Sequence, residues 1–385
     1  MNRSRVYAKI GPARLPCQSS PTHYQETPRM SPKSLAIAAA LAALLPLAAY
    51  AQQGPYKILN TAKVGGDGGF DYVTADPANR TLYVARSGAA GHIGVFNLDT
   101  LAQVGDIPGA SGHGAMVDDA TGHGFATSKP VTMFDAKTFA VIKKIDVEGN
   151  PDGYLNDPVN HRFYVLSHSA PNVTVLDDKD GSILGTIDLG GAPEQAALDG
   201  KGKMYIDLED KDAIAVVDSN AMKMVGKYDL SSVSGGCAGL ALDAKNNILF
   251  SACRDKNDMV ILSATDGHII ANLPIGIGCD GATFNPETME AFSSQGDGSL
   301  TVIKESSPTS FAVEQTVTTP VRAKTLTLDS KTGHILLITA EYGPAPAPAA
   351  APPAPAPGAA PGAPGGRGPR APMLPGSFSI VVVGK

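Results

Sequence analysis

A unit of about forty residues recurs seven times along this chain. The stretch DPANRTLYVARSGAAGHIGVFNLDT, which begins at Asp76, is matched by DPVNHRFYVLSHSAPNVTVLDDKD, which begins at Asp157. A fixed period of this length is typical of proteins that stack one supersecondary unit many times. The turn residue that opens each copy follows the previous one by 39 to 44 residues, and the seven positions are Asp76, Asp118, Asp157, Asp199, Asp243, Asn285 and Asp329.

Each copy is built from short runs that alternate with period two. The runs TLYVA, RFYVL and ILFSA are followed by IGVFN, VTVLD and IAVVD, and then by runs such as VIKKI that lead into glycine-rich steps. Counting the run before each turn residue gives four strands per copy, and no stretch shows a helical stripe. We therefore predict an all-β, seven-bladed β-propeller with four-stranded antiparallel blades. A two-sheet sandwich is the alternative, but it offers no natural place for seven equal units.

The seventh copy is interrupted. After HILLITAEY, a segment rich in Pro, Ala and Gly runs over residues 343–375, and the chain then ends in the apolar run SFSIVVVGK. This copy lacks one strand, whereas YKILNTAKVGG, from Tyr56, is a strand without a blade of its own. We predict that the N-terminal strand closes the last blade, which removes the exposed edges of an open ring. The Pro/Ala/Gly-rich segment is then a disordered loop inserted in blade seven.

Residues 1–51 have the features of a signal peptide. Lys33 precedes an apolar run that ends in Ala-Tyr-Ala at residues 49–51, and the true start could be Met30. We expect export to the periplasm or the cell exterior, with no membrane span after cleavage. Residues 52–385, the expected propeller, carry 25 Lys and Arg against 36 Asp and Glu, a formal charge of −11. This acidic balance argues against nucleic acid as a partner.

The strands and turns resemble those of one known family. The runs YVA and YVL, the V-x-x-x-D turns and the step GGAP at residues 190–193 are similar to the YVTN-repeat β-propellers, exported bacterial proteins of the YncE-like type. The chain has no tryptophan, on which the motifs of quinoprotein and WD-repeat propellers depend. The resemblance implies binding or scaffolding at least as readily as catalysis, and lactonase-type enzymes are among the family's neighbours.

One position of the repeat is expected to form a ring at the channel mouth. The first strand of each blade lines the channel, so the residue five places before each turn residue should face the rim. A structural repeat would favour small residues here, and the simplest reading of charged ones is a polar, water-filled mouth. The alternatives are ligand binding and catalysis. The seven rim residues are Asp71, His113, Asp152, Glu194, Ala238, Asp280 and Lys324.

Asp152, Asp280 and His113 could hold a divalent cation, because carboxylates with a histidine suit calcium or zinc. No cofactor is certain, and the absence of a C-x-x-C-H motif excludes covalently attached haem.

The loops between second and third strands should open on the same face. Among their side chains, Arg86 and Arg254 follow equivalent strands and could clamp a carboxylate or phosphate, although surface ion pairing would explain them as well. The full set is Arg86, His92, His168, Asp207, Glu209 and Arg254.

Three cysteines follow the signal peptide. We predict a disulfide between Cys237 and Cys253, which lie on adjacent antiparallel strands, and a free Cys279. A metal site with three thiolates is the alternative.

These features favour a monomeric binding or scaffold protein that uses its rim face for a protein, a peptide or a small-molecule ligand. The competing hypothesis is a lactonase-like, metal-dependent hydrolase whose metal is held by rim carboxylates and His113. Nothing in the sequence resembles a hydrolytic triad, so whether the protein is an enzyme stays open, with binding favoured.

Overall fold

Four-stranded antiparallel sheets account for nearly all of the regular structure in the computed structural model, which describes residues 54–88, 91–344 and 371–385. The first four sheets follow one another in sequence, and a single 3-10 turn, Glu209–Lys211, follows β15. Their strands are β2 (Gly69–Asp76), β3 (Thr81–Ser87), β4 (His92–Asn97) and β5 (Gln103–Pro108); β6 (Gly112–Asp118), β7 (His123–Ser128), β8 (Val131–Asp135) and β9 (Val141–Ile145); β10 (Pro151–Asp157), β11 (Arg162–Ser167), β12 (Val173–Asp177) and β13 (Ile183–Ile187); β14 (Pro193–Leu198), β15 (Lys203–Leu208), β16 (Ala213–Asp218) and β17 (Lys223–Asp229).

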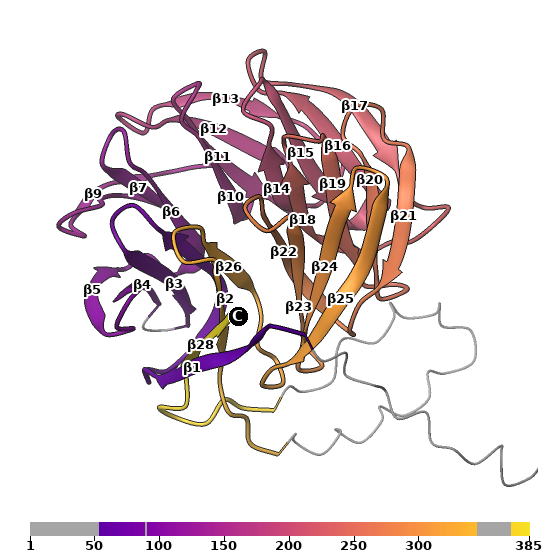
Figure 1. The fold of residues 1–385 in the computed structure, drawn as a ribbon. Coiled ribbons are helices and arrows are strands. Elements are labelled where there is room, and N and C mark those ends of the chain that lie inside the picture. Colours follow the sequence, from indigo (N-terminus) through magenta and orange to yellow (C-terminus); the bar gives the residue numbers. More distant parts are fainter. Residues whose placement is uncertain (1–53, 89–90, 345–370) are drawn as a thin grey trace, which may run out of the picture. The chain divides into compact units, whose positions relative to one another are not determined.

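The remaining three sheets continue the pattern, and the last combines strands from the two ends of the described chain (Figure 1). Their strands are β18 (Cys237–Asp243), β19 (Ile248–Cys253), β20 (Asp258–Ser263) and β21 (Ile269–Pro274); β22 (Cys279–Asn285), β23 (Glu290–Gln295), β24 (Ser299–Ser307) and β25 (Ser310–Thr318); β26 (Leu326–Asp329), β27 (His334–Thr339), β28 (Ser379–Gly384) and β1 (Lys57–Lys63). The inner strands contact one another in the cyclic order β2, β6, β10, β14, β18, β22 and β26, and β26 returns to β2. The predicted seven-bladed propeller is confirmed.

The hydrophobic core is divided among the interfaces between neighbouring blades. Tyr164 and Leu166 of blade three, for example, pack with Met204 and Ile206 of blade four. The aromatic or aliphatic side chain that the repeat places on each second strand is buried in every blade, because both faces of an inner hairpin meet a neighbour. Each blade therefore depends on the two beside it.

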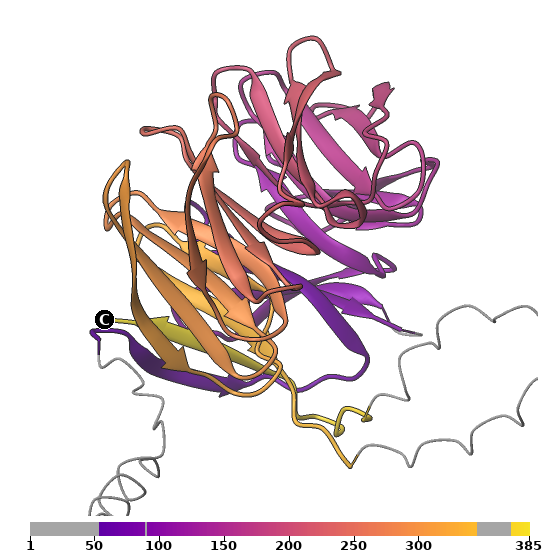
Figure 2. The same ribbon diagram turned by 90° about the vertical axis from the view of Figure 1, so that its right-hand side faces the viewer.

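The N-terminal strand closes blade seven, as predicted. Strand β1 pairs antiparallel with β28, from Lys57 opposite Gly384 to Lys63 opposite Ser379, and both figures show the two strands side by side (Figures 1 and 2). Tyr56, just before β1, is buried, and its hydroxyl donates to the Glu290 carboxylate of blade six.

Polar contacts reinforce this closure between blades one and seven. The Arg80 guanidinium makes a two-pronged contact with the buried Asp329 carboxylate, with Nη1 to Oδ1 at 2.7 Å and Nη2 to Oδ2 at 2.8 Å. Such bidentate pairs are among the stronger ionic contacts in proteins.

The two ends of the inserted segment meet where it leaves blade seven. Tyr342 forms an isolated antiparallel bridge with Met373, and the Gly343 amide donates to the Pro372 carbonyl at 2.9 Å. The rest of the predicted insertion, residues 345–370, lies outside the described residues, as does the predicted signal peptide 1–51 with Met30. In the described part of the chain, no helix has the length and apolar character needed to cross a membrane.

We predict that deleting residues 56–64 destabilises the protein far more than replacing residues 345–370 with two glycines. The first change removes β1 and a buried aromatic side chain, whose loss alone typically costs about 3–5 kcal/mol. The second alters only loop-closure entropy, which depends on the logarithm of length. The free energy of unfolding, measured by urea titration, tests this, and equal losses would contradict the role of β1.

Candidate functional site

A β-bulge recurs at the start of the first hairpin in six blades. The pairing register shifts between Phe70 and Val73 in blade one, and between the equivalent residues of blades two to six. Each shift spans the residue that the repeat assigns to the rim. Bulges bend a strand and change the direction of a side chain, so this position can face the channel mouth without disturbing the rest of the hairpin. In blade seven Lys324 lies just before β26.

The rim residues meet at one cavity of about 300 Å³. Ala238 is the one member of the predicted ring that does not line it, and blade five contributes Arg254 there instead. Two residues from the loops after second strands, His168 and Glu209, complete the wall. The predicted rim residues in the lining are Asp71, His113, Asp152, Glu194, Asp280 and Lys324.

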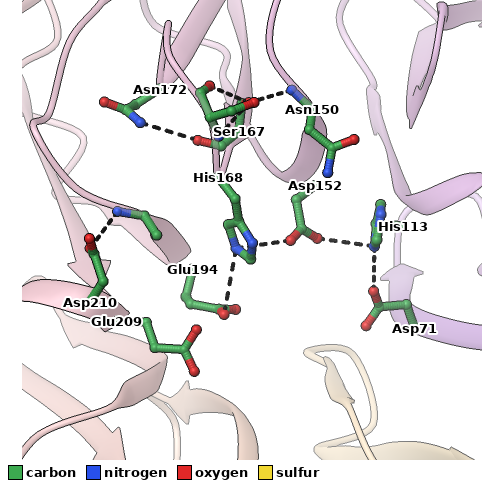
Figure 3. Close-up of polar contacts among 12 residues, drawn as sticks. Asp71, His113, Asn150, Asp152, Ser167, His168, Asn172, Glu194, Glu209 and Asp210 are labelled. Carbon is green, nitrogen blue, oxygen red and sulfur yellow. Dashed lines mark hydrogen bonds and ion pairs between the residues drawn. The ribbon is translucent and has the colours of Figure 1, made fainter. Parts of the chain in front are cut away.

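One half of the mouth alternates carboxylates and imidazoles (Figure 3). His113 Nδ1 lies 2.6 Å from Asp71 Oδ2 and 3.2 Å from Asp152 Oδ1. His168 Nε2 lies 3.0 Å from the other oxygen of Asp152 and 3.6 Å from Glu194 Oε1. The Asp152 carboxylate is thus held between two histidines.

The protonation of this half follows from its contacts. The hydrogen bond to Asp71 raises the pKa of His113, so its charged form is favoured. Burial raises the pKa of Asp152, although the His113 charge opposes the effect. The two pKa shifts have different main causes, and the 2.6 Å contact shows a hydrogen bond between His113 Nδ1 and Asp71 Oδ2.

Glu194 and Glu209 form a carboxyl pair at the junction of the two halves. Burial, followed by the hydrogen bond with Glu209, raises the pKa of Glu194 to about 9. Two adjacent carboxyl groups in a buried site cannot both ionise at low cost, so Glu194 favours its protonated form at neutral pH.

In the other half of the mouth, two cationic side chains pair with the Asp280 carboxylate. Arg254 Nη2 donates to Asp280 Oδ1 at 2.7 Å, its other terminal nitrogen donates to Glu209, and Lys324 pairs with the second oxygen of Asp280. Arg254 Nε also donates to the Cys279 carbonyl at 2.9 Å.

The predicted metal set of Asp152, Asp280 and His113 needs a correction. Asp280 is occupied by Arg254 and Lys324, and the donor atoms that lie within 4.8 Å of one another belong to Asp71, His113 and Asp152.

Arg86 does not reach the mouth, contrary to the expectation that it could clamp an anion. Its side chain is buried, its guanidinium donates to the carbonyls of Gly65 and Asp67 at 3.2 and 3.0 Å, and it stacks on Phe378 at 3.9 Å. The glycine-rich step before β2 supplies these carbonyls, so Arg86 ties this step to blade seven.

Cys237 and Cys253 form a disulfide between β18 and β19, and Cys279 is a buried free thiol. The three-thiolate alternative therefore has no support in the described structure.

Asp207 is also buried and accepts a hydrogen bond from Ser251 at 2.9 Å, and burial raises its pKa well above the usual range. His92 pairs with Asp106 at 3.5 Å and does not line the mouth.

A larger cavity of about 1080 Å³ opens beside the mouth and shares four residues with it. Its outer wall is the base of the insertion, where Tyr342 and Met373 meet, and Phe70 adds a further apolar surface. The Arg322 guanidinium lies 4.2 Å above the Tyr342 ring. Sequence reasoning missed Arg322 because it belongs to the irregular step before β26. The shared residues are Asp71, Arg254, Asp280 and Lys324.

Gln195 links three blades next to the mouth. Its amide oxygen accepts from the backbone amides of Leu240 at 3.0 Å and Ala282 at 2.9 Å, and its amide nitrogen donates to the Ala282 carbonyl. Together with Tyr72 and Tyr154 it lines a smaller pocket of about 130 Å³. The rigid inner strands thus support the rim side chains from below.

Comparison with known proteins identifies the fold of this chain but not its family or function. No family model matches the chain, and no curated protein sequence matches it. A solved structure titled "Crystal structure of RRP9 WD40 repeats" is similar with a TM-score of 0.61 at 11% identity, over 73% of this chain and 89% of the other. A chain in the "Crystal Structure of Mitotic Checkpoint Complex" is similar with a TM-score of 0.60 at 12% identity, over 73% and 88%. The chain therefore has a WD40-like seven-bladed propeller fold.

We predict that Glu194→Gln flattens the pH dependence of stability above pH 5. Because the folded pKa is raised, the protonated carboxyl stabilises the fold below the ordinary pKa, and this contribution is lost as pH rises toward 9. One such group changes the free energy of unfolding by at most about 1.4 kcal/mol per pH unit. Urea titrations between pH 5 and pH 9 measure the slope. Glu287→Gln, at an exposed turn, is the matched control, and identical slopes for all three proteins would contradict the raised pKa of Glu194.

Proposed function

We propose that this protein is a binding protein whose rim face captures a ligand that carries a carboxylate on an apolar body, such as a small organic acid or the C-terminus of a peptide. The observation that carries this is the larger cavity, where an arginine stacked on tyrosine faces apolar side chains beside the charged mouth.

Arg322 is the main anion-binding candidate. No carboxylate pairs with its guanidinium among the described residues, whereas Arg254 and Lys324 are both engaged by Asp280. Stacking on Tyr342 holds the guanidinium plane in place, which lowers the entropy lost when it binds a carboxylate. Its planar donors match the two oxygens of a carboxylate.

The apolar body of such a ligand would contact Phe70, Met373 and Pro375, which line the same cavity. A volume of about 1080 Å³ lies at the upper end of the range of roughly 300–1,000 Å³ usual for small-molecule sites. The size suits a short peptide segment or a small molecule.

The YVTN-repeat resemblance and the signal-peptide features support action in the periplasm or outside the cell. The Cys237–Cys253 disulfide favours the same oxidising compartments. Binding or scaffolding is also what that resemblance implies.

Metal-dependent hydrolysis is the second candidate, favoured by the cluster of Asp71, His113 and Asp152 at a solvent-filled mouth. Metal-bound water could act there as a nucleophile. Binding remains the better-supported function, because the larger cavity offers recognition groups that need no metal.

We predict that N-acetylated tripeptides ending in Leu, Phe or Met bind with a free C-terminus and bind much more weakly as C-terminal amides. A charge-assisted hydrogen bond contributes about 1.5–3 kcal/mol, or roughly 10–100-fold in Kd. Arg322→Ala should remove this difference, as measured by isothermal titration calorimetry.

The control is Lys245→Ala, an exposed cation in the β18–β19 turn, which should bind as the parent does. Equal affinity for the acid and amide forms, or no binding of either form, would contradict the proposal.

A further inference from the structure

Three potential metal ligands converge from three successive blades. Asp71 on β2, His113 on β6 and Asp152 on β10 place one donor atom each within 4.8 Å of the others, and Figure 3 shows their side chains pointing toward one another. The Nδ1 atom of His113 lies between the two carboxylates, 2.6 Å from Asp71 Oδ2 and 3.2 Å from Asp152 Oδ1.

These separations are close to those around a bound ion. Zinc takes imidazole nitrogen and carboxylate oxygen at about 2.0–2.2 Å, which sets tetrahedral donor atoms roughly 3.3–3.6 Å apart. The His113 separations of 2.6 and 3.2 Å lie just below this spacing, and the Asp71 and Asp152 donor atoms lie within 4.8 Å of each other, so side-chain rotations would bring the three donors to it. One nitrogen with two oxygens is a donor set suited to zinc and to other first-row divalent metals.

A second layer of contacts orients the ligands. His168 Nε2 holds the Asp152 oxygen that does not face His113, at 3.0 Å, which fixes the carboxylate plane. Partners of this kind are typical of metal sites, where they orient the ligating side chains.

The neighbouring cations do not compete for these ligands. Arg254 pairs with Glu209 and Asp280, and Lys324 pairs with Asp280, on the other half of the mouth. All three side chains line the cavity of about 300 Å³, so the cluster is accessible from it.

The fold itself does not require these three side chains. The equivalent position holds alanine in blade five, at Ala238, and lysine in blade seven, at Lys324, with the same propeller geometry. Two carboxylates and an imidazole at three adjacent blades therefore call for an explanation other than folding.

We propose that Asp71, His113 and Asp152 bind a divalent transition-metal ion, zinc above all, with one coordination position open to the cavity. Three protein ligands and an open position are the arrangement of reactive rather than structural zinc sites.

The inference goes beyond the binding function proposed above. Asp71 also lines the larger cavity, so the open position would lie next to a bound carboxylate ligand. Only this last consequence rests on the proposed function.

The test is titration of the metal-free, full-length protein with ZnCl₂ in a calorimeter, and with CoCl₂ followed by visible absorption. We expect one saturable site, with cobalt bands of a four- or five-coordinate ion. His113→Ala and Asp71→Asn should each weaken zinc binding by at least about 100-fold, since loss of an orienting partner alone costs about 10–100-fold.

The matched control is His268→Ala, which removes an exposed histidine paired with Asp266 at 3.5 Å and should leave the site intact. Circular dichroism verifies that each variant is folded. The absence of a saturable site in the parent, unchanged affinity in folded His113→Ala, or an equal loss in His268→Ala would overturn the inference.

Two further measurements separate this inference from the proposed function. Arg322→Ala should keep its zinc affinity, and acid-selective peptide binding in the presence of EDTA should persist. Peptide binding without zinc binding overturns the metal site alone, and zinc binding without peptide binding supports the metal site while contradicting the carboxylate pocket.

Discussion

The structure depends on burying both faces of every blade. A four-stranded sheet with apolar residues on each side is stable only between two neighbours, so a row of seven blades must close into a ring. The closure combines the β1–β28 pairing with the Arg80–Asp329 contact between blades one and seven. Tyr56 extends it to blade six through Glu290. The fold is therefore held by contacts between segments that lie more than two hundred residues apart.

The same closure creates the mouth. Once the ring forms, the beginnings of the first strands of all blades lie together near the axis. Charged side chains that are about forty residues apart in sequence then become neighbours. Asp152 lies between two histidines, and Asp280 lies between Arg254 and Lys324. Most of these charges are thus compensated by others in the ring. Arg322 differs, because the contact recorded for its guanidinium among the described residues is with the Tyr342 ring. This contrast is the reason why we propose Arg322 as the ligand-binding group.

The repeat alone predicted the blades, the closing strand and the convergence of the rim residues, because each follows from period and position. Side-chain partners could not be predicted in the same way. The Arg86 side chain is buried because its guanidinium donates to carbonyls of the glycine-rich step before β2. Asp280 pairs with Arg254, which supplies the charge of blade five in place of the uncharged Ala238. Arg322 and Gln195 were missed, since their roles depend on contacts across blades. Positions inside strands are predictable from periodicity, whereas irregular steps are decided by tertiary contacts.

The bulge at the start of the first hairpin in six blades affects how such proteins can diversify. It separates the side chain at the mouth from the alternation that buries the rest of the strand, so that alanine, histidine and carboxylates all occupy the same place in different blades. Because the mouth positions of different blades can vary nearly independently, one scaffold can present many different recognition surfaces. Two propellers with the same framework can therefore have entirely different side chains at the channel mouth. A shared fold carries little information about which ligand binds there.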